Sequence, residues 1–143
     1  MKRFLIIAAF FAVAYLWGNQ SEDGSAPAEV ANSSSRITAA VFDRGNSGSL
    51  VQGSGVVIRV LSDDNDGSRH QRFIVQLQTG QTLLIAHNID LAPRIASLRK
   101  GDTVSFNGEY EWNDKGGVIH WTHHDPQGRH VPGWIKHNGQ TYQ

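Results

Sequence analysis

The chain has 143 residues, with 13 basic and 13 acidic side chains and no cysteine. This length has room for one domain with a modest core, and the lack of cysteine excludes disulfides, thiolate metal ligands and a cysteine nucleophile. The balanced charge gives no strong electrostatic case for nucleic-acid binding, because proteins that neutralise phosphates usually carry a clear basic excess.

The first 18 residues predict export from the cytoplasm. Lys2 and Arg3 precede an uninterrupted apolar run over residues 4–17, which suits a signal peptide and is shorter than the roughly 20 residues of a spanning helix. The best cleavage site, at residues 26–28, lies far beyond this run, so an uncleaved inner-membrane anchor stays an alternative. In both cases we expect the rest of the chain outside the cytoplasm, in the periplasm or secreted, because the positive end stays inside.

A linker and the start of the folded domain come next. Residues 19–35 are rich in Ser, Ala and Asn and show no periodicity, which is typical of a flexible linker. We expect one domain over residues 36–143. Ser35 is a candidate cap for a short N-terminal helix in which Ile37, Ala40 and Val41 share a face, and Gly45 is a candidate for its end.

Five strand patterns and one helix pattern follow. Residues 55–62, 72–77, 82–89, 103–112 and 118–124 are β-branched, apolar or alternating, as strands are. Between the third and fourth strands, Leu91, Ile95 and Leu98 have helical spacing, and they predict a helix over residues 90–100. This order is that of an OB-fold, a mainly β, five-stranded Greek-key barrel with a helix between strands three and four.

The second and third strands form a predicted hairpin. If Thr79 and Gly80 are a two-residue loop, Arg72 lies opposite His87. In an OB-fold the third strand pairs with the fifth, so we expect these two side chains near the fifth strand.

The fourth and fifth strands form another hairpin, with residues 113–116 as its loop. This register sets Glu109 opposite His120 and Gly108 opposite Trp121. We therefore expect Trp121 in the core, with its indole over the glycine, and His120 on the surface beside Glu109. A carboxylate and an imidazole so placed are either an ordinary cross-strand pair or a tuned general base.

Two long motifs resemble a known family. The segments "SRHQRFIVQLQTGQTLLIAHNIDLAPRI" and "GDTVSFNGEYEWNDKGGVIHWTHHDPQGRHVPGWIKHNGQTYQ" are similar to an uncharacterised bacterial family, the domain of unknown function 3465. The resemblance implies a small exported bacterial protein and carries no activity with it.

Residues 118–139 hold five of the seven histidines. Much of this stretch is turn sequence, since residues 125–128 suit a type I turn and Asn138-Gly139 predicts a tight C-terminal hairpin. His120 and His124 would lie roughly 13 Å apart along a strand, too far to share one ion. His124, Asp125 and His130 remain the candidate metal ligands, although their spacing does not favour a native divalent metal.

We expect the face of the third and fifth strands to bind an unknown ligand. Polar faces of OB-folds are more often binding faces than reaction centres. The leading hypothesis is therefore an exported OB-fold binding module for an oligonucleotide, an oligosaccharide or an anionic envelope component. The candidate ligand-binding residues are Arg72, His87, Asn88, Glu109, His120, His124, Arg129 and His130.

Two other functions stay open. One is a metal-assisted hydrolase, such as a phosphodiesterase or nuclease, with His87, His124 and Asp125 as catalytic candidates. The other is a structural envelope protein that docks a protein partner. A serine nucleophile is not favoured, because the Gly-Ser-Gly at residues 53–55 lacks the pattern of a nucleophile elbow.

Overall fold

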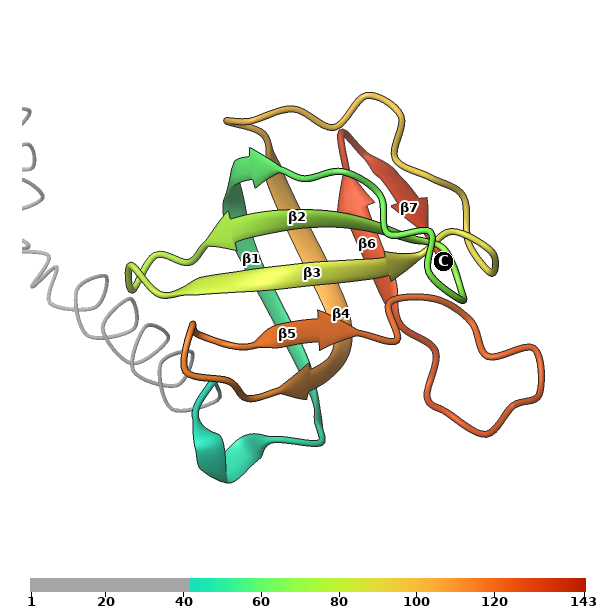
Figure 1. Cartoon of the computed structure of the whole chain (residues 1–143), viewed down its shortest axis with the longest axis horizontal. Coiled ribbons are helices and arrows are strands. Elements are labelled where there is room, and N and C mark those ends of the chain that lie inside the picture. The colour runs from blue at the N-terminus through green and yellow to red at the C-terminus, as the bar shows by residue number, and fades with distance from the viewer. Residues whose placement is uncertain (1–41) are drawn as a thin grey trace, which may run out of the picture. The chain divides into compact units, whose positions relative to one another are not determined.

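The computed structural model describes residues 42–143, which form a closed, mainly β barrel with a C-terminal hairpin (Figure 1). A short 3-10 helix precedes the barrel. The elements are η1 (Arg44–Asn46), β1 (Ser49–Val60), β2 (His70–Gln76), β3 (Thr82–Asn88), β4 (Thr103–Glu111), β5 (Val118–His120), β6 (Trp134–His137) and β7 (Gln140–Tyr142).

The strand pairing confirms an OB-like barrel. The order is β1-β2-β3-β5-β4, and β4 closes the barrel by pairing with β1. The β3–β5 pair is parallel and the other pairs are antiparallel. The β6–β7 hairpin confirms the predicted C-terminal hairpin, with Asn138 and Gly139 at positive φ as a tight primed turn requires.

The edge of β4 that faces β5 is shared by two strands. Its residues 109–111 pair with β5 and its residues 104–107 pair with β6. Between β5 and β6 the chain leaves the barrel over residues 121–133 and then returns to the same edge (Figure 1). We call this segment the excursion.

The core follows the alternation of the strands. Every second residue of β2, β3 and β4 is buried, as a barrel with a filled interior requires. Phe42, which precedes η1, packs its ring edge-on against Tyr110 at 5.4 Å between ring centroids. The fully buried apolar side chains are Val57, Phe73, Val75, Leu83, Ile85, Ile95, Phe106, Tyr110, Ile119 and Ile135.

The predicted register of the β2–β3 hairpin is wrong by one residue. The loop has three residues rather than two, because Leu77 and Gln81 are the last bonded pair and Gly80 adopts a φ of 88°. Three-residue hairpins commonly close with such a left-handed residue. As a result His87 lies opposite Gln71, and Arg72 lies opposite Ala86.

The helix predicted over residues 90–100 is also wrong, since η1 is the only helix among residues 42–143. Side chains of the barrel bind the backbone groups that a helix would use. The amide of Gln71, which is fully buried, accepts from the Ile95 N–H at 2.8 Å and donates to the Ile95 carbonyl at 2.9 Å. Ile95 and Leu98 are buried as predicted, but Leu91 is 43% exposed.

The N-terminal predictions fall mostly outside the described residues. This holds for the signal or anchor over residues 1–18, the linker over 19–35 and most of the helix expected from Ser35. At the end of that expected helix the chain forms η1, in which Gly45 is the middle residue and Asp43 is the cap. Among the described residues, no helix has the length and apolar character to cross a membrane.

Candidate binding hollow

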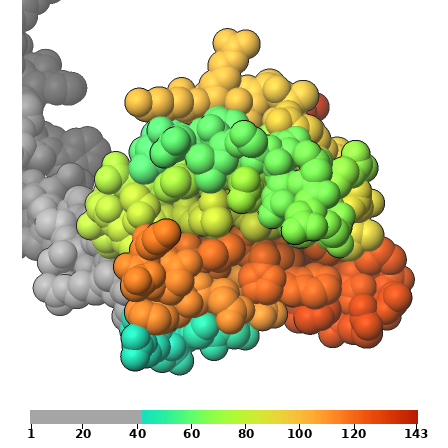
Figure 2. All heavy atoms as spheres, viewed as in Figure 1, coloured from blue at the N-terminus to red at the C-terminus, as the bar shows by residue number. Residues whose placement is uncertain are grey.

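A hollow of about 340 Å³ lies where β3 and β5 end. The β1–β2 loop, the start of the β3–β4 loop and the first residues of the excursion surround it, and Figure 2 shows the green β1–β2 loop meeting the orange-red excursion. An ion pair between Arg69 and Asp90, at 2.7 Å, ties the two loops together. The lining residues are Ser68, His70, Asn88, Leu91, His120, Trp121 and His123.

Trp121 lines this hollow and is not a core residue, so that prediction is wrong. Strand β5 ends at His120, and Trp121 adopts a φ of 55°, which turns its side chain away from the interior. The place over Gly108 is taken by the His120 carbonyl and the Thr122 methyl group. A bulky residue in the left-handed region costs of order 1–3 kcal/mol, and such strain often occurs at binding sites.

The excursion is organised by the side chain of Asp125. Its carboxylate accepts from the backbone N–H groups of Gln127 at 2.9 Å, Arg129 at 2.7 Å and His130 at 3.1 Å. These bonds, that of Gln127 foremost, hold the pKa of Asp125 below its usual range. The Gly128 N–H donates to the Asp125 carbonyl, which confirms the predicted turn. Asp125 therefore acts on the backbone of its own loop.

The five histidines of residues 118–139 do not gather at one point. Each has a different environment, and only His120 and His123 line the hollow. Within residues 42–143, the atoms of the predicted metal set of His124, Asp125 and His130 do not converge as ligands of one ion would. His123 donates to the His124 carbonyl, His124 itself is exposed, the ring of His130 stacks on Trp121 at 3.8 Å, and buried His137 lies 2.8 Å from Asp102.

His87 lies inside the barrel, so the expectation that it shares an outer face with His124 is wrong. Its side chain is fully buried. Because a carbonyl can only accept, Nε2 donates to Pro93 at 3.2 Å, and Nδ1 accepts from the Thr122 hydroxyl at 2.8 Å. Burial lowers the pKa of His87 to about 4, because the interior disfavours the charged form. Both nitrogens of the neutral ring are thus occupied.

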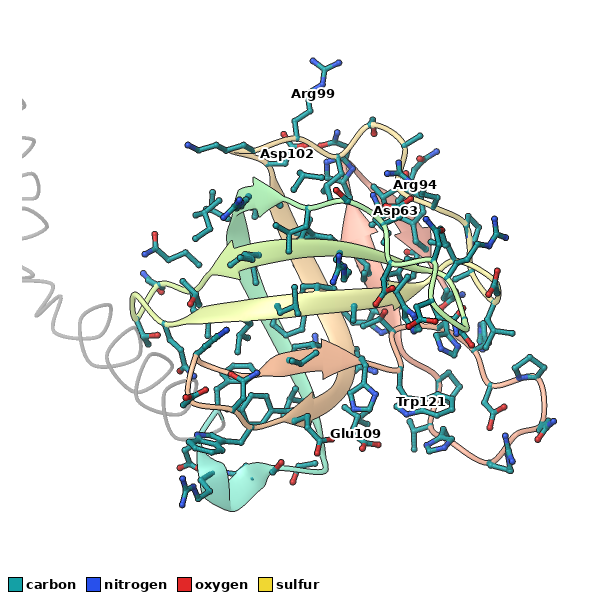
Figure 3. All side chains as sticks on the ribbon, viewed as in Figure 1. Asp63, Arg94, Arg99, Asp102, Glu109 and Trp121 are labelled. Carbon is teal, nitrogen blue, oxygen red and sulfur yellow. The ribbon has the colours of Figure 1, made fainter. Side chains whose placement is uncertain are left out.

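His120 faces outward beside two carboxylates. Its position next to Glu109 was predicted, and Glu111 is the second neighbour. Its Nε2 lies 3.7 Å from a carboxylate oxygen of Glu109 and 3.6 Å from one of Glu111. Figure 3 places Glu109 and Trp121 at the same end of the barrel. Within residues 42–143, Glu109, Glu111 and His120 are the only three residues that bring ligating atoms within 4.8 Å of one another.

The sequence of the chain matches one family of known proteins. The model of the family described as "Protein of unknown function (DUF3465)" matches residues 25–143. The chain belongs to this family. The match includes the whole barrel, the hollow and the excursion, and it agrees with the resemblance seen in the two long motifs. Among curated proteins, none matches the chain significantly.

The sequence located part of the hollow of this DUF3465 protein and missed the rest. Asn88 and His120 were predicted and line it, but Arg72 lies on the outer side of β2, where its guanidinium donates to the Ser62 carbonyl. Arg129 is exposed on the excursion. The lining residues that the sequence reasoning missed are Ser68, His70, Leu91, Trp121, which was expected in the core, and His123. Of these residues, only His70 could have been found from the sequence, because it continues the alternation of outward-facing residues in β2.

Proposed function

We propose that this DUF3465 protein is an exported binding module whose hollow holds a sugar ring of an oligosaccharide. The lining of the hollow carries the proposal. Trp121 and Leu91 offer apolar surface, and Ser68, Asn88 and three imidazoles offer hydrogen bonds. A volume of about 340 Å³ is at the small end of the range for small-molecule sites, which suits one ring or a short segment. OB-fold barrels are known to bind oligosaccharides and oligonucleotides.

The charge around the hollow favours a neutral ligand over a phosphate-bearing one. Proteins hold phosphates largely with Arg and Lys, and within the described residues neither type lines the hollow. Glu109 and Glu111 lie beside His120 and add negative charge there. Oligonucleotides and anionic envelope components are therefore less favoured than neutral glycans.

A titration followed by NMR tests the proposal. We expect neutral oligosaccharides of glucose or N-acetylglucosamine to shift amide signals around the hollow, and an oligothymidylate to leave them unchanged. Trp121→Ala should weaken sugar binding at least about tenfold, since truncation of a central aromatic side chain of a binding site commonly costs about 2 kcal/mol or more. Trp134→Ala is the matched control, because Trp134 lies outside the hollow under Lys136.

Two results would contradict the binding of an oligosaccharide in the hollow. One is saturable binding of the oligothymidylate with no response to any sugar, which would favour an oligonucleotide. The other is equal weakening by Trp121→Ala and Trp134→Ala, which would separate binding from the hollow. The hydrolase hypothesis gains no specific support, because the Asp125 carboxylate binds three backbone N–H groups of its own loop.

Export is part of the proposal and rests on the basic and then apolar N-terminus. A reporter that is active only outside the cytoplasm, fused after Ser35, should give a signal. The same fusion without residues 1–18 is the control and should be silent. A stable fusion that stays silent with residues 1–18 present would contradict export.

A further inference from the structure

We propose that Glu109, Glu111 and His120 form a binding site for a divalent metal ion, with zinc as the first candidate. The site lies at the edge of the hollow, because His120 belongs to both. The inference does not depend on the identity of any organic ligand. It also differs from the metal set that the sequence suggested, which lies on the excursion.

The strand pairing of the barrel sets the three side chains beside one another. Glu109 and Glu111 are two residues apart on β4 and therefore point to the same face. His120 on β5 lies directly opposite Glu109. Because β4 is paired with β1 on its other edge as far as Tyr110, the backbone at Glu109 is held by strands on both sides.

The distances are close to those that a bound ion requires. Zinc lies about 2.0–2.2 Å from nitrogen and oxygen ligands, so two ligands of a tetrahedral ion are about 3.4 Å apart. The Nε2 of His120 is 3.7 Å and 3.6 Å from the nearest oxygens of Glu109 and Glu111. These separations exceed a hydrogen bond and lie within about 0.3 Å of the spacing between two ligands of a zinc ion.

The Nε2 atom of His120 also supports a bound ion. The Nε2 of His120 is shielded from solvent and has no hydrogen-bond partner. Buried polar atoms are nearly always satisfied, and each exception needs an explanation such as an ion. This atom points between two carboxylates, and a cation bound there would satisfy all three groups.

The donor set indicates the class of ion. Two carboxylates and one imidazole suit zinc and its first-row neighbours better than a soft metal, which prefers sulfur. Three protein ligands also leave a fourth position of a tetrahedral ion for water or a ligand group.

Calorimetric titration of zinc into the untagged full chain tests the site. We expect about one zinc per chain, and at least about tenfold weaker binding by Glu111→Gln and by His120→Gln. Glu111 is mostly exposed, so Glu111→Gln should fold normally even if His120→Gln does not. His124→Asn is the matched control, since His124 is an exposed histidine outside the set, and it should bind zinc as the wild type does.

Three outcomes would overturn the proposal. The first is no saturable zinc binding, and the second is unchanged affinity in Glu111→Gln. The third is a loss of binding in His124→Asn, which would move the site to the excursion. Trp121→Ala separates this inference from the proposed oligosaccharide site, because it should leave zinc affinity unchanged while it weakens sugar binding.

Discussion

The buried imidazole of His87 makes a specific prediction about acid stability. Its pKa is lowered from 6.5 to about 4, chiefly by burial, so the folded protein favours the neutral ring. The unfolded chain takes up a proton at His87 as the pH falls below about 6.5, while the folded chain does not until about pH 4. The stabilisation by the neutral ring is therefore complete above pH 6.5 and is lost between pH 6.5 and 4.

The size of the effect follows from the two pKa values. A difference of one pKa unit corresponds to 1.36 kcal/mol, so the free energy of unfolding should fall by about 3 kcal/mol from pH 7 to pH 4 through His87 alone. That is a large share of the 5–15 kcal/mol that typically stabilises a domain. Below pH 4 this contribution should change little, because both states are then protonated.

Urea unfolding at a series of pH values measures this change. His87→Gln is the comparison, because glutamine can still donate and accept hydrogen bonds but does not titrate. Carboxylates with lowered pKa values, such as those of Asp102 and Asp125, also lose stabilisation as the pH falls, but they do so in both proteins. We expect the wild type to lose about 3 kcal/mol more than His87→Gln between pH 7 and pH 4. Parallel curves would refute the reasoning.

Three further predictions concern packing and loop structure. Gln71→Leu should cost about 2–4 kcal/mol of unfolding free energy in chemical denaturation, because it leaves both backbone groups of Ile95 unsatisfied. Gly133→Ala should destabilise by more than about 2 kcal/mol, since its Cβ would overlap the backbone of the excursion, whereas Gly128→Ala, in open space at a φ of 64°, should cost about 1 kcal/mol. Asp125→Ala should speed hydrogen exchange of the loop amides and lower the free energy of unfolding by about 1–2 kcal/mol. Exchange rates equal to those of the wild type would show that the three bonds of Asp125 do not hold the loop.

The barrel topology was predictable because alternation and turn residues are local signals. The β4–β5 hairpin has its expected register, with Glu109 opposite His120. The alternation of residues in β3 also indicated the correct face for each side chain. The prediction instead followed the register of a two-residue turn. His87 has the parity of Leu83 and Ile85, both fully buried, and this alone assigns it to the interior. A shift of one residue changes the face of every side chain in a strand.

The β3–β4 segment and the hollow were not predictable because distant residues determine them. The spacing of Ile95 and Leu98 suits a helix, but the side chain of Gln71, 24 positions away in sequence, binds the Ile95 backbone instead. The end of β5 at His120 likewise involves residues that are distant in the sequence. Where the chain leaves the barrel, Gly133 lies close to the backbone of Trp121 and Thr122, and no local pattern encodes that contact.

One buried side chain links the stability of the barrel to the shape of the hollow. The Nδ1 of His87 accepts from Thr122, the residue after Trp121, and its Nε2 donates to Pro93, two residues after Leu91. Residues close in sequence to both apolar walls of the hollow are thus bonded to a single neutral ring in the interior. Protonation of His87 would place a charge in the core and reverse the bond to Thr122, since Nδ1 would then donate to the hydroxyl oxygen. Because the ring of folded His87 takes up a proton only near pH 4, the folded hollow should keep its indole wall from pH 6.5 to about 4, the range in which the free energy of unfolding falls.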